Sequence, residues 1–311
     1  MTDNSTIAQY LRDKAFADSA ILLDDLQLGK LGIAMPSMVD RLKQRKSDWN
    51  WPAPNGSRLA MIKQVLGSKL AARNWVARRN VRQAELYWEG RSITPSVLSD
   101  LPPRFVVKPA NAHSCKGVIL FDRGRDLMAR SPVSLAELPS AVEQARATDN
   151  LPPQTSWLIE ELIADVDERY RIPRDFKIFV AGGHSFLFYV TDRNCPRALW
   201  SRSFFTRDWK RIQSPLIGAR EDGPNFARPA RLAELLAASD MMARELGIFI
   251  RLDFYLTAQG PVFGEFTPFP NHGLDNTTLG ERTFSQLWGL FPDPPLNDAY
   301  LPGMSPANDE P

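Results

Sequence analysis

The sequence predicts an α+β fold, because its hydrophobic pattern contains two antiparallel hairpins and an amphipathic helix. Residues 174–190 and residues 251–267 each consist of two short runs rich in aromatic and β-branched side chains around a turn that contains glycine. Between them, residues 229–246 have helical spacing, with Pro229 near the first turn and Gly247 directly after the end. These elements predict helices combined with antiparallel sheet.

Composition places the chain among ordinary globular proteins. It has 311 residues, 43% of them hydrophobic, and a formal net charge of +2, so the overall charge does not indicate a nucleic-acid partner. The two cysteines, Cys115 and Cys195, disfavour a disulfide framework or a zinc site. The N-terminus lacks a secretory pattern, and no apolar run is long enough to cross a bilayer. We therefore expect a cytoplasmic protein without a transmembrane segment.

The second hairpin, residues 251–267, has one apolar face and one polar face. We expect a three-residue loop at residues 258–260, with Gly260 supplying the left-handed conformation. That loop places Asp253 opposite Glu265 and Arg251 opposite Thr267, and successive side chains alternate between the two faces. The polar face then carries two facing carboxylates beside an arginine.

Two carboxylates directly across a strand pair stand about 5 Å apart and repel each other. A fold tolerates this when a cation lies between them or when water covers them. Two oxygen donors beside an arginine suggest Mg²⁺ holding phosphate oxygens. The alternative is a solvated polar face with two unrelated acids, and a one-residue shift in register would also separate the pair.

Three other stretches carry candidate ligand-binding residues. The run 105–109 predicts a buried strand with Lys108 near its end, followed by a polar loop, which suits a phosphate clamp. Here the alternative is an exposed hairpin with a solvated lysine. The run 157–163 could offer backbone groups to a planar base while its aliphatic side chains sandwich the base. Lys177 lies mid-strand among apolar residues, where an unpaired charge costs free energy.

The two ends of the chain show no catalytic pattern. Residues 1–35 predict a weakly amphipathic helix, and residues 291–311 are rich in proline, which indicates an extended or disordered tail. Residues 41–82 are strongly basic. They could form a surface for an anionic polymer or a peripheral membrane contact, and the alternative is a solvated helical face.

The order of these elements resembles the ATP-grasp superfamily over about residues 104–280. The sequence is similar to the TupA-like group, which is linked to teichuronopeptide and other surface-polysaccharide synthesis. The similar blocks are residues 68–95, 101–108, 175–177 with 182–183, 192–193, 208–210, and 251–255 with 263–268.

The resemblance implies two α+β subdomains that sandwich ATP, preceded by a helical and basic N-terminal region. The implied organisation is an N-terminal region at residues 1–100, a lid subdomain at 101–163, a C-terminal subdomain at 164–290 and a proline-rich tail at 291–311.

The resemblance also implies a set of ATP-binding residues. Lys108 would hold the α- and β-phosphates while the loop 110–117 closes as a lid. Backbone groups near Glu161 and Ile163 would meet the adenine, Glu160 would lie near its amino group, and Asp167 would bind the ribose hydroxyls. The complete implied set is Lys108, Ser114, Gly117, Glu160, Glu161, Ile163, Asp167 and Lys177.

The implied catalytic residues neutralise the transferring γ-phosphoryl group, and they are Lys177, Arg193 and Arg251. The implied metal ligands are Asp253, Glu265, Thr267 and Asn271. Thr267 departs from the family pattern, because many members have asparagine two residues after the metal-binding glutamate. Asn271 is the alternative amide donor.

The function that the resemblance implies is an ATP- and Mg²⁺-dependent ligase, which activates a carboxylate as an acyl phosphate and joins it to an amine or hydroxyl. Its substrate would be a small molecule or a glycan precursor of a surface polysaccharide, with no nucleic acid involved. The alternatives are a kinase of the same fold that phosphorylates a hydroxyl, and a nucleotide-binding scaffold without turnover. The sequence predicts no oligomeric state.

Overall fold

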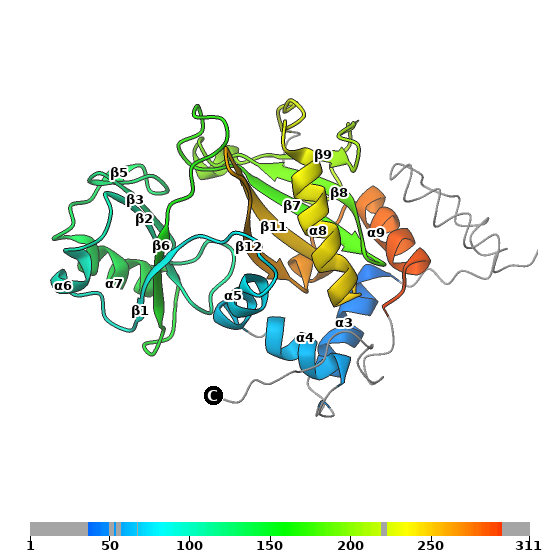
Figure 1. The fold of residues 1–311 in the computed structure, drawn as a ribbon, viewed down its shortest axis with the longest axis horizontal. Coiled ribbons are helices and arrows are strands. Elements are labelled where there is room, and N and C mark those ends of the chain that lie inside the picture. Colours follow the sequence, from blue (N-terminus) through cyan, green and yellow to red (C-terminus); the bar gives the residue numbers. More distant parts are fainter. Residues whose placement is uncertain (1–36, 50–52, 54–56, 67, 219–222, 294–311) are drawn as a thin grey trace, which may run out of the picture. The chain divides into compact units, whose positions relative to one another are not determined.

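The computed structural model describes residues 37–49, 53, 57–66, 68–218 and 223–293 (Figure 1). The expected N-terminal helix at residues 1–35 and residues 294–311 of the expected tail lie outside these ranges. Two six-stranded sheets with helices around them confirm the predicted α+β class. None of the helices in these ranges is long and apolar enough to span a membrane.

The chain divides into two compact units. The first unit comprises residues 1–67, 175–254 and 265–311, and the second comprises residues 68–174 and 255–264.

The sheet that carries the first unit has the strand order β10-β9-β8-β7-β11-β12, and residues 255–264 at the tip of its last hairpin belong to the second unit. The neighbouring strands from β10 through β11 all pair antiparallel. The strands are β7 (Asp175–Ala181), β8 (His184–Thr191), β9 (Arg202–Thr206), β10 (Arg211–Ile212), β11 (Ile250–Thr257) and β12 (Gly260–Thr267). Both predicted hairpins are therefore confirmed, as β7–β8 and β11–β12.

The turn of the β11–β12 hairpin differs slightly from the prediction. β11 ends at Thr257 and β12 begins at Gly260, so the loop between them has two residues rather than the three expected. Gly260 does have a positive φ, 124°, as the first residue of β12. The hydroxyl of Thr257 donates to the carbonyl of Gly260 at 2.9 Å and closes the turn.

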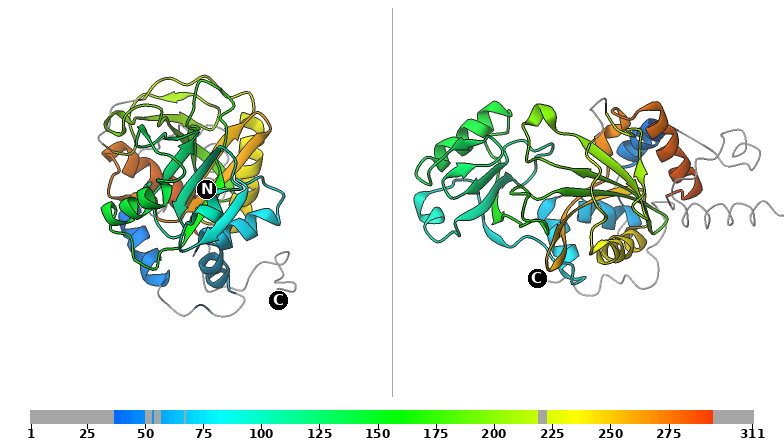
Figure 2. Two further views of the ribbon diagram at one scale, coloured as in Figure 1. Left: turned by 90° about the vertical axis from the view of Figure 1, so that its left-hand side faces the viewer. Right: turned by 90° about the horizontal axis from the view of Figure 1, so that it is seen from above.

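Helices cover both faces of this sheet. Helix α8 (Leu232–Leu246) contacts β7 and β8, and it ends at Gly247 with a φ of 65°, which confirms the predicted helix and its C-terminal glycine. Figure 2 shows α8 on one face of the sheet and α9 (Thr278–Leu290) on the other. The remaining described helices of this unit are α3 (Met38–Trp49), α4 (Arg58–Leu66), η1 (Arg197–Leu199) and η2 (Pro270–Gly273).

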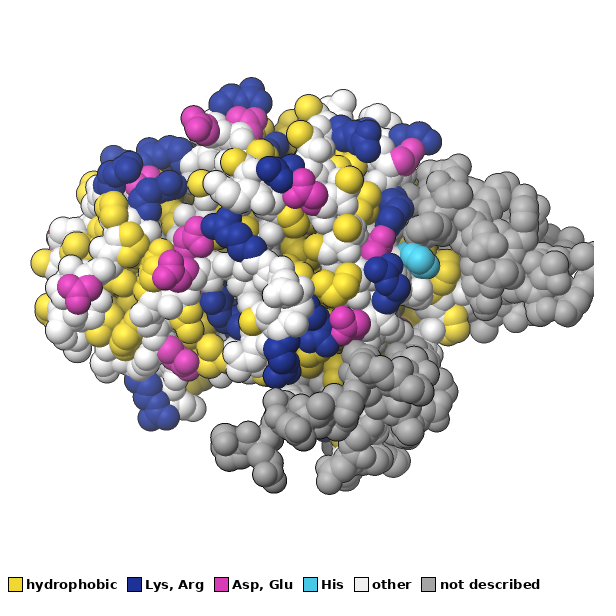
Figure 3. All heavy atoms as spheres, in the orientation of Figure 1, with side chains coloured by type: hydrophobic (Ala, Val, Ile, Leu, Met, Phe, Trp, Pro, Cys, Tyr) yellow, Lys and Arg dark blue, Asp and Glu magenta, His cyan; other side chains and the backbone are white. Residues whose placement is uncertain are grey.

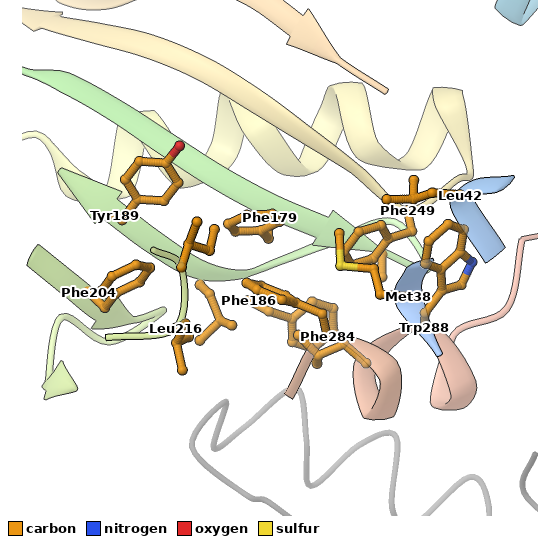
Figure 4. Close-up of a cluster of buried hydrophobic side chains, with 14 residues drawn as sticks. Met38, Leu42, Phe179, Phe186, Tyr189, Phe204, Leu216, Phe249, Phe284 and Trp288 are labelled. Atoms are coloured by element: carbon orange, nitrogen blue, oxygen red, sulfur yellow. The ribbon is translucent and has the colours of Figure 1, made fainter. Parts of the chain in front are cut away.

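The core of the first unit is a cluster of aromatic side chains between the sheet, α3 and α9 (Figure 4). Phe249 stacks on Trp288 with ring centroids 4.6 Å apart, and the ring centroids of Phe179 and Phe284 lie 4.4 Å apart. Tyr189 lies at the edge of this cluster in Figure 4, where its hydroxyl points away from the other labelled side chains. The cluster holds the middle of β7 and the start of β11, the strands that carry the candidate site.

The sheet of the second unit has the order β1-β6-β2-β3-β4-β5. Its strands are β1 (Leu86–Gly90), β2 (Arg104–Pro109), β3 (Ile119–Asp122), β4 (Arg125–Asp126), β5 (Ser131–Pro132) and β6 (Trp157–Glu161), and its helices are α5 (Lys69–Ala77), α6 (Pro95–Leu98) and α7 (Leu138–Thr148). Strand β1 lies within the N-terminal region that the sequence predicts as helical.

The two faces of this second sheet differ in character. Phe105 and Val107 face a core that includes Leu138 and Val142 of α7. Because side chains alternate along a strand, Lys108 points to the opposite face. The antiparallel pairing of β2 with β6 brings the side chains of both strands together on each face.

Charged side chains of both signs are interspersed on the face of the molecule drawn in Figure 3. Among the described side chains visible there, no large area carries a single sign. This mixed surface agrees with the formal net charge of +2.

Candidate functional site

Strand register brings three polar side chains together on one face of the first sheet. Lys177 in β7 pairs with Tyr189 in β8 on one side and with Asp253 in β11 on the other. Residues directly opposite each other in antiparallel strands project to the same face. Tyr189, Lys177 and Asp253 therefore form a row across three adjacent strands.

Two carboxylates hold the ammonium of Lys177. Its Nζ contacts Oδ2 of Asp253 and lies 3.0 Å from Oδ2 of Asp175. Nη2 of Arg193 also contacts Oδ2 of Asp175, at 2.6 Å. Asp175 thus joins two of the three cations that the sequence predicts as catalytic.

Arg251 occupies the centre of the site. Its Nε donates to Oδ1 of Asp253 at 2.6 Å, and its Nη2 donates to Oδ2 of the same carboxylate at 2.8 Å. Nη1 donates to the hydroxyl of Tyr189 at 3.1 Å, and Nη2 also donates to Oγ1 of Thr267 at 2.9 Å. Oε1 of Glu265 lies 3.7 Å from Nη2. The guanidinium therefore lies between Asp253 and Glu265, which the sequence predicts to face each other.

Burial and charge balance together explain the electrostatics of the cluster. The residues Lys177, Arg251, Asp175 and Asp253 are all less than one tenth exposed, whereas the side chain of Glu265 is 43% exposed. Burial alone would raise the pKa of Asp175, but Arg193 and Lys177 lower it well below its ordinary value.

The same balance keeps the cations charged. Burial alone would lower the pKa of Lys177, yet Asp175 and Asp253 raise it above its ordinary value. Asp253 and Tyr189 likewise raise the pKa of Arg251 against the effect of burial. Both side chains therefore stay protonated across the physiological range.

Of the two alternatives that the sequence left open, a cation between the acids is present as Arg251, so neutralising them does not by itself require a metal ion. A carboxylate oxygen can accept about two bonds. Oδ2 of Asp253 accepts from both Lys177 and Arg251, whereas among the described residues Oδ1 accepts from Arg251 alone. One position on Oδ1 and the half-exposed carboxylate of Glu265 remain as hard oxygen donors, which fit a magnesium ion.

Further metal donors are limited in the described part of the chain. The hydroxyl of Thr267 lies 3.5 Å from Oε1 of Glu265, on the same side of the site. The side chain of Asn271 lies outside what the structure describes. No group of three or more histidine, cysteine, aspartate or glutamate side chains is placed to hold a metal within the described ranges. The metal assignment stays a prediction.

The second unit carries a separate charged group on its sheet. Nζ of Lys108 contacts Oε1 of Glu160, and Nη1 of Arg73 lies 3.4 Å from the other oxygen. Beside this pair lies a small apolar cluster that contains Val106, Leu120, Leu162 and Ile172. An apolar strip that ends at a lysine is suited to a planar group with an anionic tail.

The loop predicted as a lid, residues 110–117, is anchored at both ends. Lys69 donates to the carbonyls of Pro109 and Ala112 at 3.0 and 2.8 Å. At the other end, the N–H of Gly117 donates to Asp149 at 2.6 Å. The backbone of the loop between these anchors includes Ser114 with a φ of 59°.

The other predicted nucleotide-binding residues have partners of their own. Glu161 pairs with Arg82 at 2.8 Å, and its N–H donates to the carbonyl of Glu85. Ile163 is buried in a small cluster that includes Val262. The N–H of Glu161 is therefore already occupied by a backbone hydrogen bond.

Asp167 has an exposed partner. A hydrogen bond from Arg169 lowers the pKa of Asp167 to about 2. Its carboxylate is therefore ionised at neutral pH and presents acceptors, as a contact to ribose hydroxyls would require.

Two residues of the cluster were given no role by the sequence. Asp175 lies two positions before Lys177, and that spacing alone places both on one face of a strand. The sequence did not indicate a role for Tyr189, because its contact with Arg251 depends on how β8, β7 and β11 align.

Comparison with protein families gives a match across most of the chain. A protein-family model described as TupA-like ATPgrasp matches residues 67–289. No curated protein matches the sequence.

Solved structures resemble the chain weakly. D-alanine–D-alanine ligase from Helicobacter pylori is 15% identical with a TM-score of 0.41, and the match covers 72% of this chain and 61% of that one. The Bacillus anthracis enzyme complexed with ATP is 13% identical with a TM-score of 0.46, covering 73% and 65%. L-amino acid ligase from Bacillus licheniformis is 13% identical with a TM-score of 0.46, covering 78% and 51%.

The chain thus matches less than two thirds of the length of these three structures. With TM-scores below 0.5, the likeness supports no statement about substrates or activity. The candidate site residues are therefore those of the charged groups around Arg251 and Lys108.

Proposed function

Because the chain belongs to the TupA-like ATP-grasp family, which its residues 67–289 match, we propose that it is an ATP- and Mg²⁺-dependent ligase. The ligase activates a carboxylate as an acyl phosphate and joins it to an amine or a hydroxyl. Its substrate class is a small molecule or glycan precursor used in surface-polysaccharide synthesis. The observation that supports this most is the buried row of Tyr189, Lys177 and Asp253 with Arg251 beside it.

The reaction has two steps that need no nucleophile from the protein. An oxygen of the substrate carboxylate attacks the γ-phosphorus of ATP, and the bond from that phosphorus to ADP breaks. The amine or hydroxyl then attacks the acyl carbon and releases phosphate. The protein contributes position and charge, as in other phosphoryl transfers.

Three cations of the first unit supply that charge. Lys177, Arg193 and Arg251 would contact the γ-phosphoryl oxygens and the leaving oxygen. In the free protein, Asp175 and Asp253 hold all three. Phosphate oxygens would compete with these carboxylates for the same donors, so binding exchanges one set of charge-assisted hydrogen bonds for another.

The metal would be held by the oxygens that remain available. Glu265 would provide the main ligand because its carboxylate is half exposed, and Oδ1 of Asp253 would provide a second. Thr267 would stand beside them as a hydroxyl donor or acceptor. When bound, Mg²⁺ would neutralise phosphate oxygens and orient them.

The second unit carries residues that would also contact a nucleotide. Lys108 would leave Glu160 for a phosphate, and Glu160 would retain Arg73 as its partner. The apolar cluster around Val106 and Leu120 would contact the adenine. Residues between the anchors of the loop 110–117, including Ser114, would cover the phosphates.

The test is ADP release from a panel of carboxylates, with and without hydroxylamine. An acyl phosphate is trapped as a hydroxamate, which is the expected product. A stable phosphate ester with no hydroxamate would instead indicate a kinase, and ATP binding without ADP release would indicate a scaffold; either result contradicts the ligase.

The matched variants are Glu265→Gln and Glu143→Gln. Glu265 is half exposed and its ion pair is long, so its loss should stop Mg²⁺-dependent ADP release while the melting temperature stays close to that of the wild type. Glu143, which is 56% exposed and pairs with Arg146 on the surface of α7, is the control that should keep full activity.

A further inference from the structure

Helix α3 precedes the part of the chain that matches the family, yet it buries one of its arginines. Arg45 is only 5% exposed. One prediction for residues 41–82 was a solvated helical face, and for Arg45 this prediction is wrong. A buried guanidinium needs partners for its charge and its N–H groups.

Those partners come from three separate segments. Nη1 of Arg45 donates to the carbonyl of Pro268 at 2.7 Å, and Nη2 donates to Asp293 at 2.6 Å. The guanidinium also lies 4.5 Å from the ring centroid of Trp288. Asp293 in turn accepts from the N–H of Phe249, which directly precedes β11. One side chain thus links α3, α9, the start of β11 and the end of β12.

The rest of α3 packs along the chain that follows β12. Trp49 meets Phe269 edge-on, with ring centroids 5.5 Å apart. At the other end of the helix, Gly273 lies so close to Val39 that an added Cβ would stand 3.0 Å from a methyl group. Helix α3 therefore contacts residues 268–273 at its two ends and through Arg45 between them.

Helix α9 fixes the first turn of α3. The N–H of Met38 donates to Glu281 at 2.7 Å and to Ser285 at 3.2 Å. These bonds satisfy a donor that has no partner within its own helix. Because α9 belongs to the aromatic core, α3 is a rigid support for the segment it contacts.

This segment leads directly into the candidate site. Pro268 follows Thr267, whose hydroxyl accepts from Arg251. Proline has no N–H to donate, so its carbonyl is the remaining backbone group that can fix its position. Arg45 occupies that carbonyl.

We propose that Arg45 is a positioning residue for the proposed ligase reaction: by holding Pro268, it fixes the end of β12 that presents Thr267 and Glu265 to Arg251. The proposal rests on the proposed function for its kinetic part only. It makes a helix outside the family match part of the working site, although the hydrogen bonds of Arg45 within the described residues go to Pro268 and Asp293 and not to the site residues.

The test compares Arg45→Met with Arg41→Met in the full chain. Methionine keeps an unbranched apolar side chain packed on Trp288, but it removes the hydrogen bonds to Pro268 and Asp293. Arg41 is the matched control, because it lies over the same ring at 5.3 Å and its buried Nε has no hydrogen-bond partner among the described residues. Hydrogen exchange, thermal unfolding and the kinetics of ADP release are measured for both.

For Arg45→Met we expect amide exchange at residues 264–273 to rise by about tenfold or more, with exchange in β7 and β8 unchanged. The kcat for ADP release should fall by about tenfold while the KM for ATP stays within about twofold. Arg41→Met should change neither quantity. Arg45→Lys keeps the positive charge but lacks the two separate N–H groups that reach Pro268 and Asp293. Relative to Arg45→Met, it should therefore restore the melting temperature more fully than it restores kcat.

Two results would overturn the proposal. One is wild-type exchange at residues 264–273 in Arg45→Met, and the other is an even rise in exchange across the whole unit, which would mean a purely structural role. Failure of the ligase function appears differently, as a wild-type protein that releases no ADP with any substrate. The exchange comparison needs no ATP and still decides the positioning role in that case.

Discussion

Arg251 donates through both Nε and Nη2 to the carboxylate of Asp253, which lies two residues along the same strand. Both side chains are less than one tenth exposed. The i, i+2 spacing puts them on one face, and the forked guanidinium matches the two oxygens of the carboxylate. The pair is therefore both the electrostatic centre of the candidate site and part of the structural interior.

Replacing Asp253 with asparagine should affect stability as well as activity. Lys177 and Arg251 would lose their shared counter-charge in a buried place. Removing one partner of a buried ion pair costs about 3–5 kcal/mol. Urea unfolding should show this loss, and ADP release should be abolished.

Asp40→Asn is the control for that experiment. Asp40 is 72% exposed and forms a loose surface pair with Lys43, so its removal should leave the urea midpoint nearly unchanged. An Asp253→Asn protein that is as stable as Asp40→Asn would contradict the ion-pair network.

Replacing Tyr189 with phenylalanine should weaken catalysis without disturbing the core. The hydroxyl accepts from Nη1 of Arg251 at 3.1 Å, while the ring packs beside Phe204 with centroids 5.4 Å apart. Loss of this acceptor should cost about 1–2 kcal/mol of stability. The kcat for ADP release should fall by about tenfold, and an unchanged kcat would show that Arg251 needs no orientation by Tyr189.

Replacing Lys108 with alanine should weaken ATP binding. Lys108 would contribute a charge-assisted contact to phosphate, and its loss should raise the dissociation constant in titration calorimetry by at least about tenfold. Lys210→Ala is the control, since Lys210 is 71% exposed and pairs with Asp208 on the surface. Wild-type affinity in Lys108→Ala would contradict its role as a phosphate ligand.

Stability should fall in acid below about pH 4. Burial raises the pKa of Asp175, but Arg193 and Lys177 lower it below its ordinary value of about 3.9. Asp240 behaves alike, because Arg207 and Ser185 outweigh its burial and lower its pKa.

A lowered folded-state pKa means that the unfolded chain binds the proton first. The stabilisation is therefore complete above about pH 4 and is lost as the pH falls through the folded pKa values. The urea midpoint should be nearly level between about pH 7 and about pH 5 and should then drop. A midpoint that is unchanged down to about pH 3 would contradict these assignments.

Replacing Gly280 with alanine should disrupt the first unit. A Cβ at this position in α9 would collide with the carbonyl oxygen of Leu216, which already accepts from the N–H of Thr277 at 3.0 Å. The contact is with backbone, so relief requires moving the helix, at a cost of about 3 kcal/mol or more.

Gly124→Ala separates this collision from backbone strain. Gly124 has a φ of 84°, and an added Cβ would meet no atom within 4 Å. Alanine there should therefore destabilise the fold only by the strain of its left-handed backbone, about 1–2 kcal/mol. Thermal unfolding should therefore rank Gly280→Ala as the less stable variant, and the opposite order would contradict the close approach of α9 to Leu216.

The local elements of this fold could be predicted from the order of the residues. The hairpins β7–β8 and β11–β12 and the helix α8 could be predicted because alternation, turn glycines and helical spacing are properties of adjacent residues. Gly247 ends α8 as expected, since only a residue tolerant of positive φ serves well there. The charged residues of the candidate site could also be identified, because a charged side chain within an apolar strand costs free energy unless it has a partner.

The tertiary structure alone decided which groups neutralise those charges. Tyr189 meets Arg251 only because β8, β7 and β11 align in one register. Arg45 meets Pro268 across 223 residues of sequence. The sequence indicated that the two acids need either a cation or water, but not that Arg251 and Lys177 provide the cation. Electrostatic pairing depends on distance in space, and hydrophobic packing between distant segments sets that distance.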